Sequence, residues 1–181
     1  MKPVIISLFL SSLCFLSCSS QSVFANESNA TGTNLIETAC QHAGQRDLCV
    51  TTLEADPNTH DADMLGLALI ALRLASSNAS DISEHAKLLF KDTTLEPTIQ
   101  DGYGECLDHY LDAAEQLDDS IAALLTKAYK DVEVWVKVAI SDADQCESAL
   151  KGKEPAMVEK NQIFRQLCNN VLAIVKVLAE K

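Results

Sequence analysis

Three polar residues in the middle of the chain have the types and the spacing of metal ligands. Glu105, His109 and Asp112 recur at positions i, i+4 and i+7, which puts two carboxylates and an imidazole on one face of a helix. Metal sites in helical bundles, however, combine inward-pointing ligands from several helices. These three residues point away from the apolar side of their own segment, so we predict a solvated acidic face and no metal site.

Cys168 is the residue that could act as a nucleophile. A reactive cysteine needs a base or a positive charge that stabilises its thiolate. Cys168 instead follows Leu167 in an apolar stretch with no histidine nearby, so we favour a buried thiol that packs as a small hydrophobic residue. The sequence also contains no phosphate-binding glycine loop, no dinucleotide-binding glycine pattern and no HExxH motif. We therefore predict that the chain is not an enzyme and uses no cofactor.

The segment that carries the acidic residues has the strongest helical period in the sequence. From Pro97 onward, apolar residues recur every three or four positions, as in an amphipathic helix, and proline is tolerated at its start. The apolar face consists of Ile99, Tyr103, Cys106, Tyr110, Ala113, Leu117, Ile121 and Leu124. The acidic face consists of Asp101, Glu105, Asp108, Asp112, Glu115, Asp118 and Asp119.

Three further segments share this period, over residues 61–91, 130–151 and 157–180. Trp135, the only tryptophan, is expected to pack in the core or at its edge. The third helix should bury Val132, Val136, Ala139, Ala143, Cys146 and Leu150. The fourth helix should bury Ile163, Leu167, Val171, Ile174 and Leu178.

Four long amphipathic helices with short connections predict an all-α fold, an antiparallel up-down-up-down four-helix bundle over residues 61–180. Residues 34–58 precede this bundle and form two short amphipathic segments around a turn at residues 42–45. Because proline cannot continue a helix, Pro57 ends the second segment. We therefore expect an N-terminal helical hairpin that packs on the bundle and completes one domain over residues 34–180.

Residues 1–25 have the pattern of a secretory signal peptide. A positive start at Lys2 is followed by an apolar stretch and by Ser-Val-Phe-Ala at positions 22–25, with small residues at positions −3 and −1 of a cleavage site. The apolar stretch is too short and too rich in serine for a membrane span of about 20 residues. We predict secretion, a flexible tail over residues 26–33 and no membrane association of the mature form. N-glycosylation sequons begin at Asn26, Asn29 and Asn78.

The mature chain would be strongly acidic, with 13 basic and 26 acidic residues and a net charge of −13. This charge excludes binding to nucleic acids and anionic membranes, which depends on lysine and arginine, and it favours a basic partner protein. Five of the seven cysteines remain after removal of the signal peptide, and four of them can pair in three ways. They are Cys40, Cys49, Cys106, Cys146 and Cys168.

Short motifs around these cysteines form a set. Residues 34–40 read NLIETAC and are followed by DLC at 47–49, while residues 106–114 read CLDHYLDAA and residues 138–146 read VAISDADQC. Four cysteines in this order and with these flanks resemble the plant pectin methylesterase inhibitor and invertase inhibitor family over nearly all of residues 34–180. The stretch 55–67 is especially similar to the plane-pollen allergen branch of that family.

The resemblance implies an inhibitor with two disulfides between sequence neighbours, Cys40–Cys49 and Cys106–Cys146, and a free thiol at Cys168. The helix assignment agrees with this pairing. Cys40 and Cys49 flank one turn, and Cys106 and Cys146 fall on the inner faces of adjacent antiparallel helices.

The family has two branches, one that caps the substrate cleft of pectin methylesterase and one that blocks cell-wall or vacuolar invertase. The resemblance places the contacts on the second and third bundle helices and their junction. In invertase inhibitors a Pro-Lys-Phe motif near this junction enters the active site, and here the corresponding Tyr129-Lys130-Asp131 keeps only the lysine. The favoured partner is therefore pectin methylesterase in a one-to-one complex, in the apoplast and cell wall.

Invertase, with a vacuolar location as an option, is the first alternative, and a non-inhibitory secreted helical protein of allergen type is the second. Our candidate partner-binding residues lie on the acidic face and at the junction. They are Asp108, Asp112, Glu115, Lys127, Tyr129, Lys130, Asp131 and Glu133.

Overall fold

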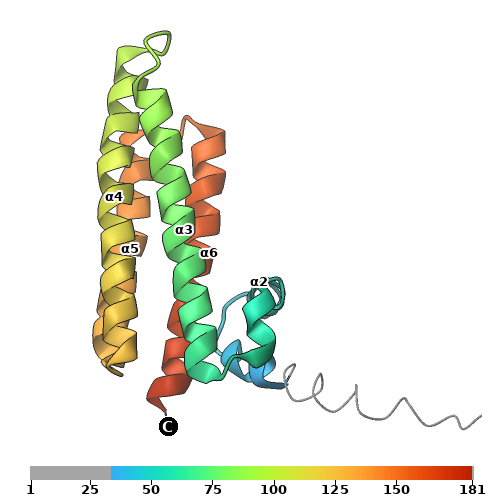
Figure 1. Ribbon diagram of the computed structural model, residues 1–181. Helices are drawn as coiled ribbons and strands as arrows, with labels where there is room; N and C mark the ends of the chain where they lie inside the picture. The colour runs from blue at the N-terminus through green and yellow to red at the C-terminus, as the bar shows by residue number, and fades with distance from the viewer. Residues whose placement is uncertain (1–33, 181) are drawn as a thin grey trace, which may run out of the picture.

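The computed structural model describes residues 34–180 and contains helices but no strand over that range. A short helical turn at residues 34–39 comes first. The other elements are α2 (Arg46–Glu54), the 3₁₀ helix η1 (Pro57–Asp61), α3 (Met64–Phe90), α4 (Pro97–Leu125), α5 (Tyr129–Ala149) and α6 (Pro155–Ala179). The four long helices form the predicted antiparallel bundle, in which α4 packs on α3 and α5, and α6 packs on the same two helices (Figure 1). The predicted signal peptide, the tail and the sequons at Asn26 and Asn29 lie outside the described residues.

The helix boundaries follow from local chemistry. The Asp63 carboxylate accepts a hydrogen bond of 2.8 Å from the backbone N–H of Gly66, so α3 begins at Met64 and not at residue 61. Pro97 and Pro155 occupy the first positions of α4 and α6, where no N–H is needed. None of the described helices is long and apolar enough to span a bilayer.

The core confirms the predicted inner faces of the second and third helices but corrects that of the fourth. Ile163, predicted to be buried, is 43% exposed, and its neighbour Phe164 is buried instead. Phe164 packs edge-on against Tyr110 with ring centroids 5.2 Å apart. The inner face of α6 includes a polar residue, Asn161, which is fully buried and accepts a 2.8 Å hydrogen bond from the Tyr110 hydroxyl. A prediction from apolar residues alone therefore placed Ile163 in the core in place of Phe164.

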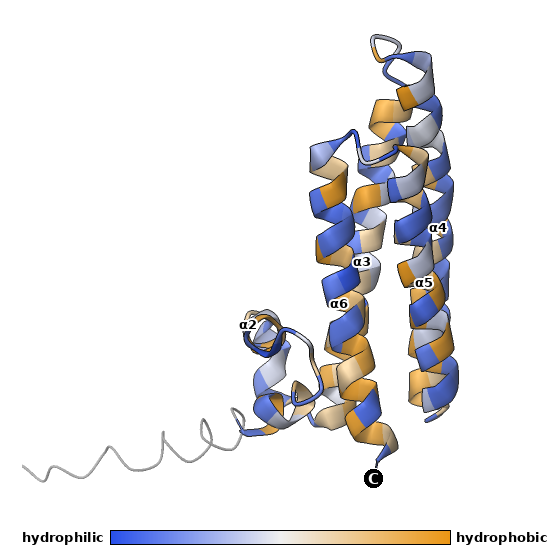
Figure 2. Ribbon diagram, turned by 180° about the vertical axis from the view of Figure 1, so that it is seen from behind, coloured by the Kyte–Doolittle hydropathy of each residue, from blue (hydrophilic) through white to orange (hydrophobic). Residues whose placement is uncertain are grey.

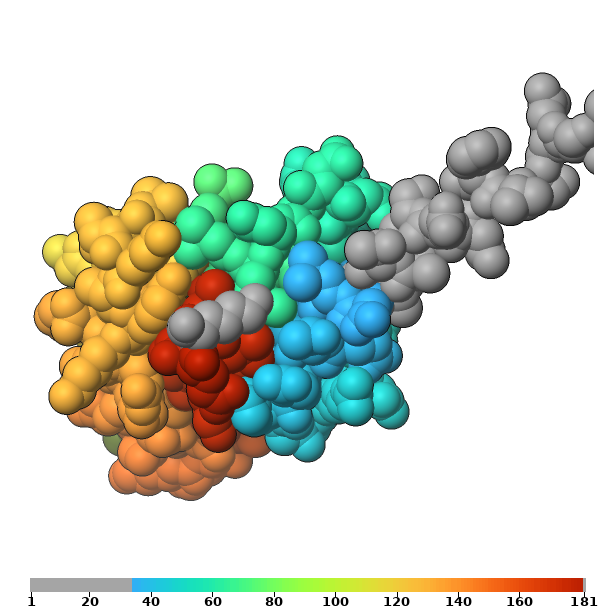
Figure 3. All heavy atoms as spheres, turned by 90° about the horizontal axis from the view of Figure 1, so that it is seen from below, coloured from blue at the N-terminus to red at the C-terminus, as the bar shows by residue number. Residues whose placement is uncertain are grey.

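Both disulfides implied by the resemblance are present, Cys40–Cys49 within the hairpin and Cys106–Cys146 between α4 and α5. The hairpin packs beside one end of the bundle, where residues of the hairpin (blue), the end of α6 (red) and the ends of α4 and α5 (yellow to orange) lie in a row (Figure 3). Nε2 of His42 lies 3.2 Å from a carboxylate oxygen of Glu180 and joins the hairpin turn to the end of α6.

Candidate protein-binding site

The three acidic residues predicted to bind a partner lie on the outer side of α4. Asp108, Asp112 and Glu115 are all exposed and follow one another at helical spacing. The acidic face is narrower than the sequence indicates, because the Asp118 carboxylate turns toward α3 and accepts a hydrogen bond of 3.1 Å from the Ser76 hydroxyl. The acidic row therefore ends at Asp118 on the side that faces α3, and α5 lies on its other side.

His109 pairs with α5 and does not join a metal-binding cluster with Glu105 and Asp112. Its Nδ1 lies 3.2 Å from Oδ1 of Asp142, whose side chain is only 8% exposed. Burial raises the pKa of the Asp142 carboxyl, and the hydrogen bond with His109 opposes that rise. Within residues 34–180 no group of three His, Cys, Asp or Glu side chains is placed to hold a metal ion.

An exposed apolar patch on α5 lies beside the acidic row. Val134, Trp135 and Val138 are 50%, 39% and 38% exposed. Trp135, Val138 and Asp142 share one side of α5 at spacing i, i+3 and i+7, and Asp142 fixes that side against His109 of α4. We call the combined surface the α4–α5 face. It consists of Asp108, Asp112, Glu115, Val134, Trp135 and Val138.

The position of Trp135 corrects the expectation that it packs in the core or at its edge. Val132, Val136 and Ala139 fill the core stripe of α5 and leave Trp135 on the flank. The apolar patch was not predicted, because its three residues do not fall on the apolar core stripe of this helix. The sequence could have indicated the patch. The core positions of this helix are already occupied by other apolar residues, so Val134, Trp135 and Val138 must lie outside the core.

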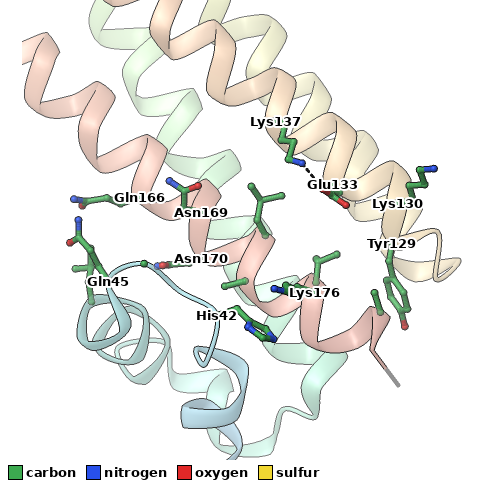
Figure 4. Close-up of a pocket in the computed structure, with 16 residues that line it drawn as sticks. His42, Gln45, Tyr129, Lys130, Glu133, Lys137, Gln166, Asn169, Asn170 and Lys176 are labelled. Carbon is green, nitrogen blue, oxygen red and sulfur yellow. Dashed lines mark hydrogen bonds and ion pairs between the residues drawn. The ribbon is translucent and has the colours of Figure 1, made fainter.

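The candidate residues at the junction divide between two surfaces. Lys127 and Asp131 are exposed near the turn between α4 and α5, and Lys127 has a positive φ of 60°. Tyr129, Lys130 and Glu133 instead line a groove on the opposite side of α5 (Figure 4). The structure therefore brings together the residues of the α4–α5 face and places Tyr129 and Glu133 away from it, while Lys130 lies one helical turn before Val134, between the two surfaces.

This second surface, which we call the α6 groove, has a volume of about 800 Å³. Helix α6 forms its floor, α5 forms one wall, and the hairpin turn with His42, Gln45 and Leu48 forms the other (Figure 4). The C-terminal half of α6 that forms the floor is mostly hydrophobic (Figure 2). The α6 residues that line the groove are four apolar side chains, three amides and one lysine.

Cys168 is fully buried, and burial raises the pKa of its thiol, so the thiolate needed for nucleophilic chemistry is disfavoured. The sequon at Asn78 lies within α3, and its amide oxygen is buried without a hydrogen-bond partner among the described residues. Neither residue contributes to the α4–α5 face.

Comparison with known proteins identifies the family. Residues 34–174 match the model of the plant invertase/pectin methylesterase inhibitor family. The chain is 29% identical to the "Putative invertase inhibitor" of Platanus orientalis, over 80% of this chain and 90% of that protein. It is 28% identical to pectinesterase inhibitor 2 of Arabidopsis thaliana, over 77% and 81% of the two chains.

Identity to the cell wall / vacuolar inhibitor of fructosidase 2 of Arabidopsis thaliana is 27%, over 96% and 98% of the two chains. The fold matches the crystal structure of a mutant pectin methylesterase inhibitor from Arabidopsis, with a TM-score of 0.67 and 20% identity over 78% of this chain and 95% of that one. The four-helix bundle, the two disulfides and the family match together establish that the chain belongs to the plant invertase/pectin methylesterase inhibitor family, which is a family of inhibitors and not of enzymes.

Proposed function

We propose that this protein is secreted into the plant cell wall and inhibits a pectin methylesterase by docking its α4–α5 face over the substrate cleft of the enzyme. The observation that carries the proposal is the apolar patch of Val134, Trp135 and Val138 beside the acidic row of α4. A protein interface commonly has an aromatic and aliphatic centre with a polar rim. The α4–α5 face has this composition.

The architecture behind this face supports inhibition by exclusion of substrate. The Cys106–Cys146 disulfide and the His109–Asp142 pair hold α4 and α5 together at one end of it. A surface that is already ordered loses little conformational entropy on binding. The acidic rim also favours a basic enzyme, because complementary charges accelerate encounter.

Two observations favour pectin methylesterase over invertase. The Pro-Lys-Phe motif expected of invertase inhibitors is replaced by Tyr129-Lys130-Asp131, and Lys130 lines the α6 groove on the other side of α5. Invertase remains the second candidate, because the relatives named as inhibitors of invertase or fructosidase are as similar to this chain as the pectinesterase inhibitors are.

A side-by-side titration tests the proposal. Purified protein with both disulfides formed is added to a pectin methylesterase and to an acid invertase, and release of methanol and of glucose is followed. We expect loss of pectin de-esterification at one equivalent of inhibitor, no change in invertase activity, and a one-to-one complex in light scattering. Salt should lower the association rate more than it raises the dissociation rate. Inhibition of invertase alone would replace the proposed target, and inhibition of neither enzyme would refute the inhibitory role of the α4–α5 face.

A further inference from the structure

The α6 groove concentrates positive charge in a chain that is otherwise strongly acidic. The sequence has 14 basic and 26 acidic residues, yet three lysines and a single carboxylate line this groove. Lys137 pairs with that carboxylate, Glu133, whereas Lys176 on the floor and Lys130 at the rim have no ion-pair partner within residues 34–180. Lys176 of α6 therefore offers an unpaired ammonium group to a negatively charged ligand, and Lys137 of α5 offers one that it shares with Glu133. The Lys130 side chain, in contrast, points away from α6 (Figure 4).

Side-chain amides line the same groove. Gln45 approaches from the hairpin turn, and Gln166, Asn169 and Asn170 approach from α6 (Figure 4). A carboxamide both donates and accepts hydrogen bonds, as a sugar hydroxyl does, so the two groups are natural partners. Asn170 is only 5% exposed, and its amide nitrogen has no hydrogen-bond partner among the described residues. Because this nitrogen is itself buried, a ligand in the groove would meet the amides of Gln45, Gln166 and Asn169, which are accessible.

The centre of the floor is small and apolar. Ala173 lies one helical turn after Asn169 and Asn170 and one turn before Lys176, and its methyl group, only 4% exposed, lies at the bottom of the groove. Leu48 and Leu172 add aliphatic surface around it. Apolar walls with a few well-placed polar groups are typical of small-molecule sites, and about 800 Å³ lies within their usual size range.

We propose that the α6 groove binds a short acidic oligosaccharide, in which carboxylates pair with Lys176 and Lys137, hydroxyls bond to the amides, and the ring faces lie over Ala173. A simple carboxylate would leave the amides unused, and a neutral sugar would leave the lysines unused. The net charge of the chain would repel a long polyanion, so the ligand should be a short one. The proposed site uses no residue of the α4–α5 face and does not depend on the identity of the inhibited enzyme.

Nuclear magnetic resonance on the ¹⁵N-labelled protein tests the site, because the side-chain amides of asparagine and glutamine are observed directly. Trigalacturonate is the probe, and maltotriose and citrate are the neutral and the non-sugar comparison compounds. We expect saturable shifts with trigalacturonate at Gln45, Gln166 and Asn169. Maltotriose and citrate should each bind at least about tenfold more weakly, since each satisfies only part of the site.

Variants locate the binding. The double variant Lys137→Gln with Lys176→Gln should weaken trigalacturonate binding by at least about tenfold, and Ala173→Leu, which fills the floor, should abolish it. Lys153→Gln removes an exposed lysine outside the groove and is the matched control. Each variant should keep the wild-type helical circular dichroism spectrum.

Shifts elsewhere on the protein, equal binding of citrate, or equal losses in Lys153→Gln would overturn the proposed site. None of these measurements includes an enzyme, so their failure would leave the proposed inhibition of pectin methylesterase untouched.

Discussion

The two sides of α5 differ in how completely they are filled. On the α4 side the two helices pack closely, and the Cys106–Cys146 disulfide and the His109–Asp142 pair join them near the C-terminal end of α5. On the α6 side, Arg165 joins the helices near the C-terminal end of α5 through its ion pairs with carboxylates there. Toward the other end of α5, the same side opens into the α6 groove.

This difference shows how one helix can present two kinds of recognition surface. The closed side offers an ordered surface of exposed side chains, which suits contact with a large protein. The open side offers a hollow with charged and amide groups, which suits a small ligand. The candidate residues of the junction should therefore not act as one site. Four experiments test this difference between the two sides.

The largest effect should come from removing the disulfide at one end of the α4–α5 face. The double variant Cys106→Ala with Cys146→Ala frees a segment with a sequence separation of 40, and chain entropy predicts a loss of about 4 kcal/mol in the free energy of unfolding. The matched variant Cys40→Ala with Cys49→Ala, with a separation of 9, should lose about 3 kcal/mol. Urea denaturation measures both, and a reversed ranking would contradict the view that the closed side carries more of the stability.

The next effect concerns the apolar patch. Trp135→Ala should weaken inhibition of pectin methylesterase by about 30-fold, which corresponds to about 2 kcal/mol at a binding hot spot. The melting temperature should change little, because Trp135 is 39% exposed. Leu88→Ala, at a residue of α3 that is 68% exposed, is the control and should inhibit normally. Equal inhibition by both variants would remove the α4–α5 face as the docking surface.

A smaller effect separates the charges on the two sides of α5. Asp112→Lys should slow association with the enzyme by about three- to tenfold at low salt, since charges at an interface rim act mainly on the association rate. Lys130→Glu should change that rate by less than about twofold, because Lys130 lines the α6 groove. Surface plasmon resonance at two salt concentrations measures both rates. A larger effect of Lys130→Glu would place the groove in the enzyme contact and favour invertase-type binding.

The smallest effect is a change in stability with pH. Burial raises the pKa of Asp142 in the folded protein, so its contribution to stability is present at low pH and is lost as pH rises through that raised pKa. Asp142→Asn can still accept the hydrogen bond from His109 but cannot ionise. Its melting temperature should exceed that of the wild type by up to about 3 °C at neutral pH.

This advantage of Asp142→Asn should disappear below the usual pKa of an aspartate, where the wild-type carboxyl is protonated in both the folded and unfolded states. Asp144→Asn, at an exposed residue of the same helix, is the comparison variant. A constant difference at all pH values would show that burial of the Asp142 charge has no role.

Most of the fold could be predicted because each helix carries its own signal. The stripe that begins at Ile99, the helix start at Pro97 and the burial of Cys168 all follow from short-range pattern and are confirmed. The last helix was expected from residue 157 and begins at Pro155, because proline is well suited to the first position of a helix. The errors arose where the stripe was not purely apolar. Asn161 occupies an inward position of α6 and shifted the predicted face toward Ile163, and polar core residues are invisible to a search for apolar periodicity.

The candidate site was predicted only in part, for a different reason. The acidic residues of α4 were found because they lie opposite a clear apolar face. The exposure of Trp135 was not predicted. The amides of the α6 groove could not be recognised from the sequence, because Gln45 and Asn170 are far apart along the chain. Only packing of the hairpin against α6 brings them to one place.

The sequence by itself determined the four long helices, most of the residues that each of them buries, and the placement of cysteines that permits the two disulfides. Helical period is a local property, and burial of one stripe per helix follows from it. Only the tertiary structure decided which neighbour each flank of α5 faces. Trp135 and Lys130 are both outside the core stripe, and nothing in their spacing says that α4 lies beside one and α6 beside the other. That assignment depends on how the four helices are arranged around their common core, which no single helix specifies.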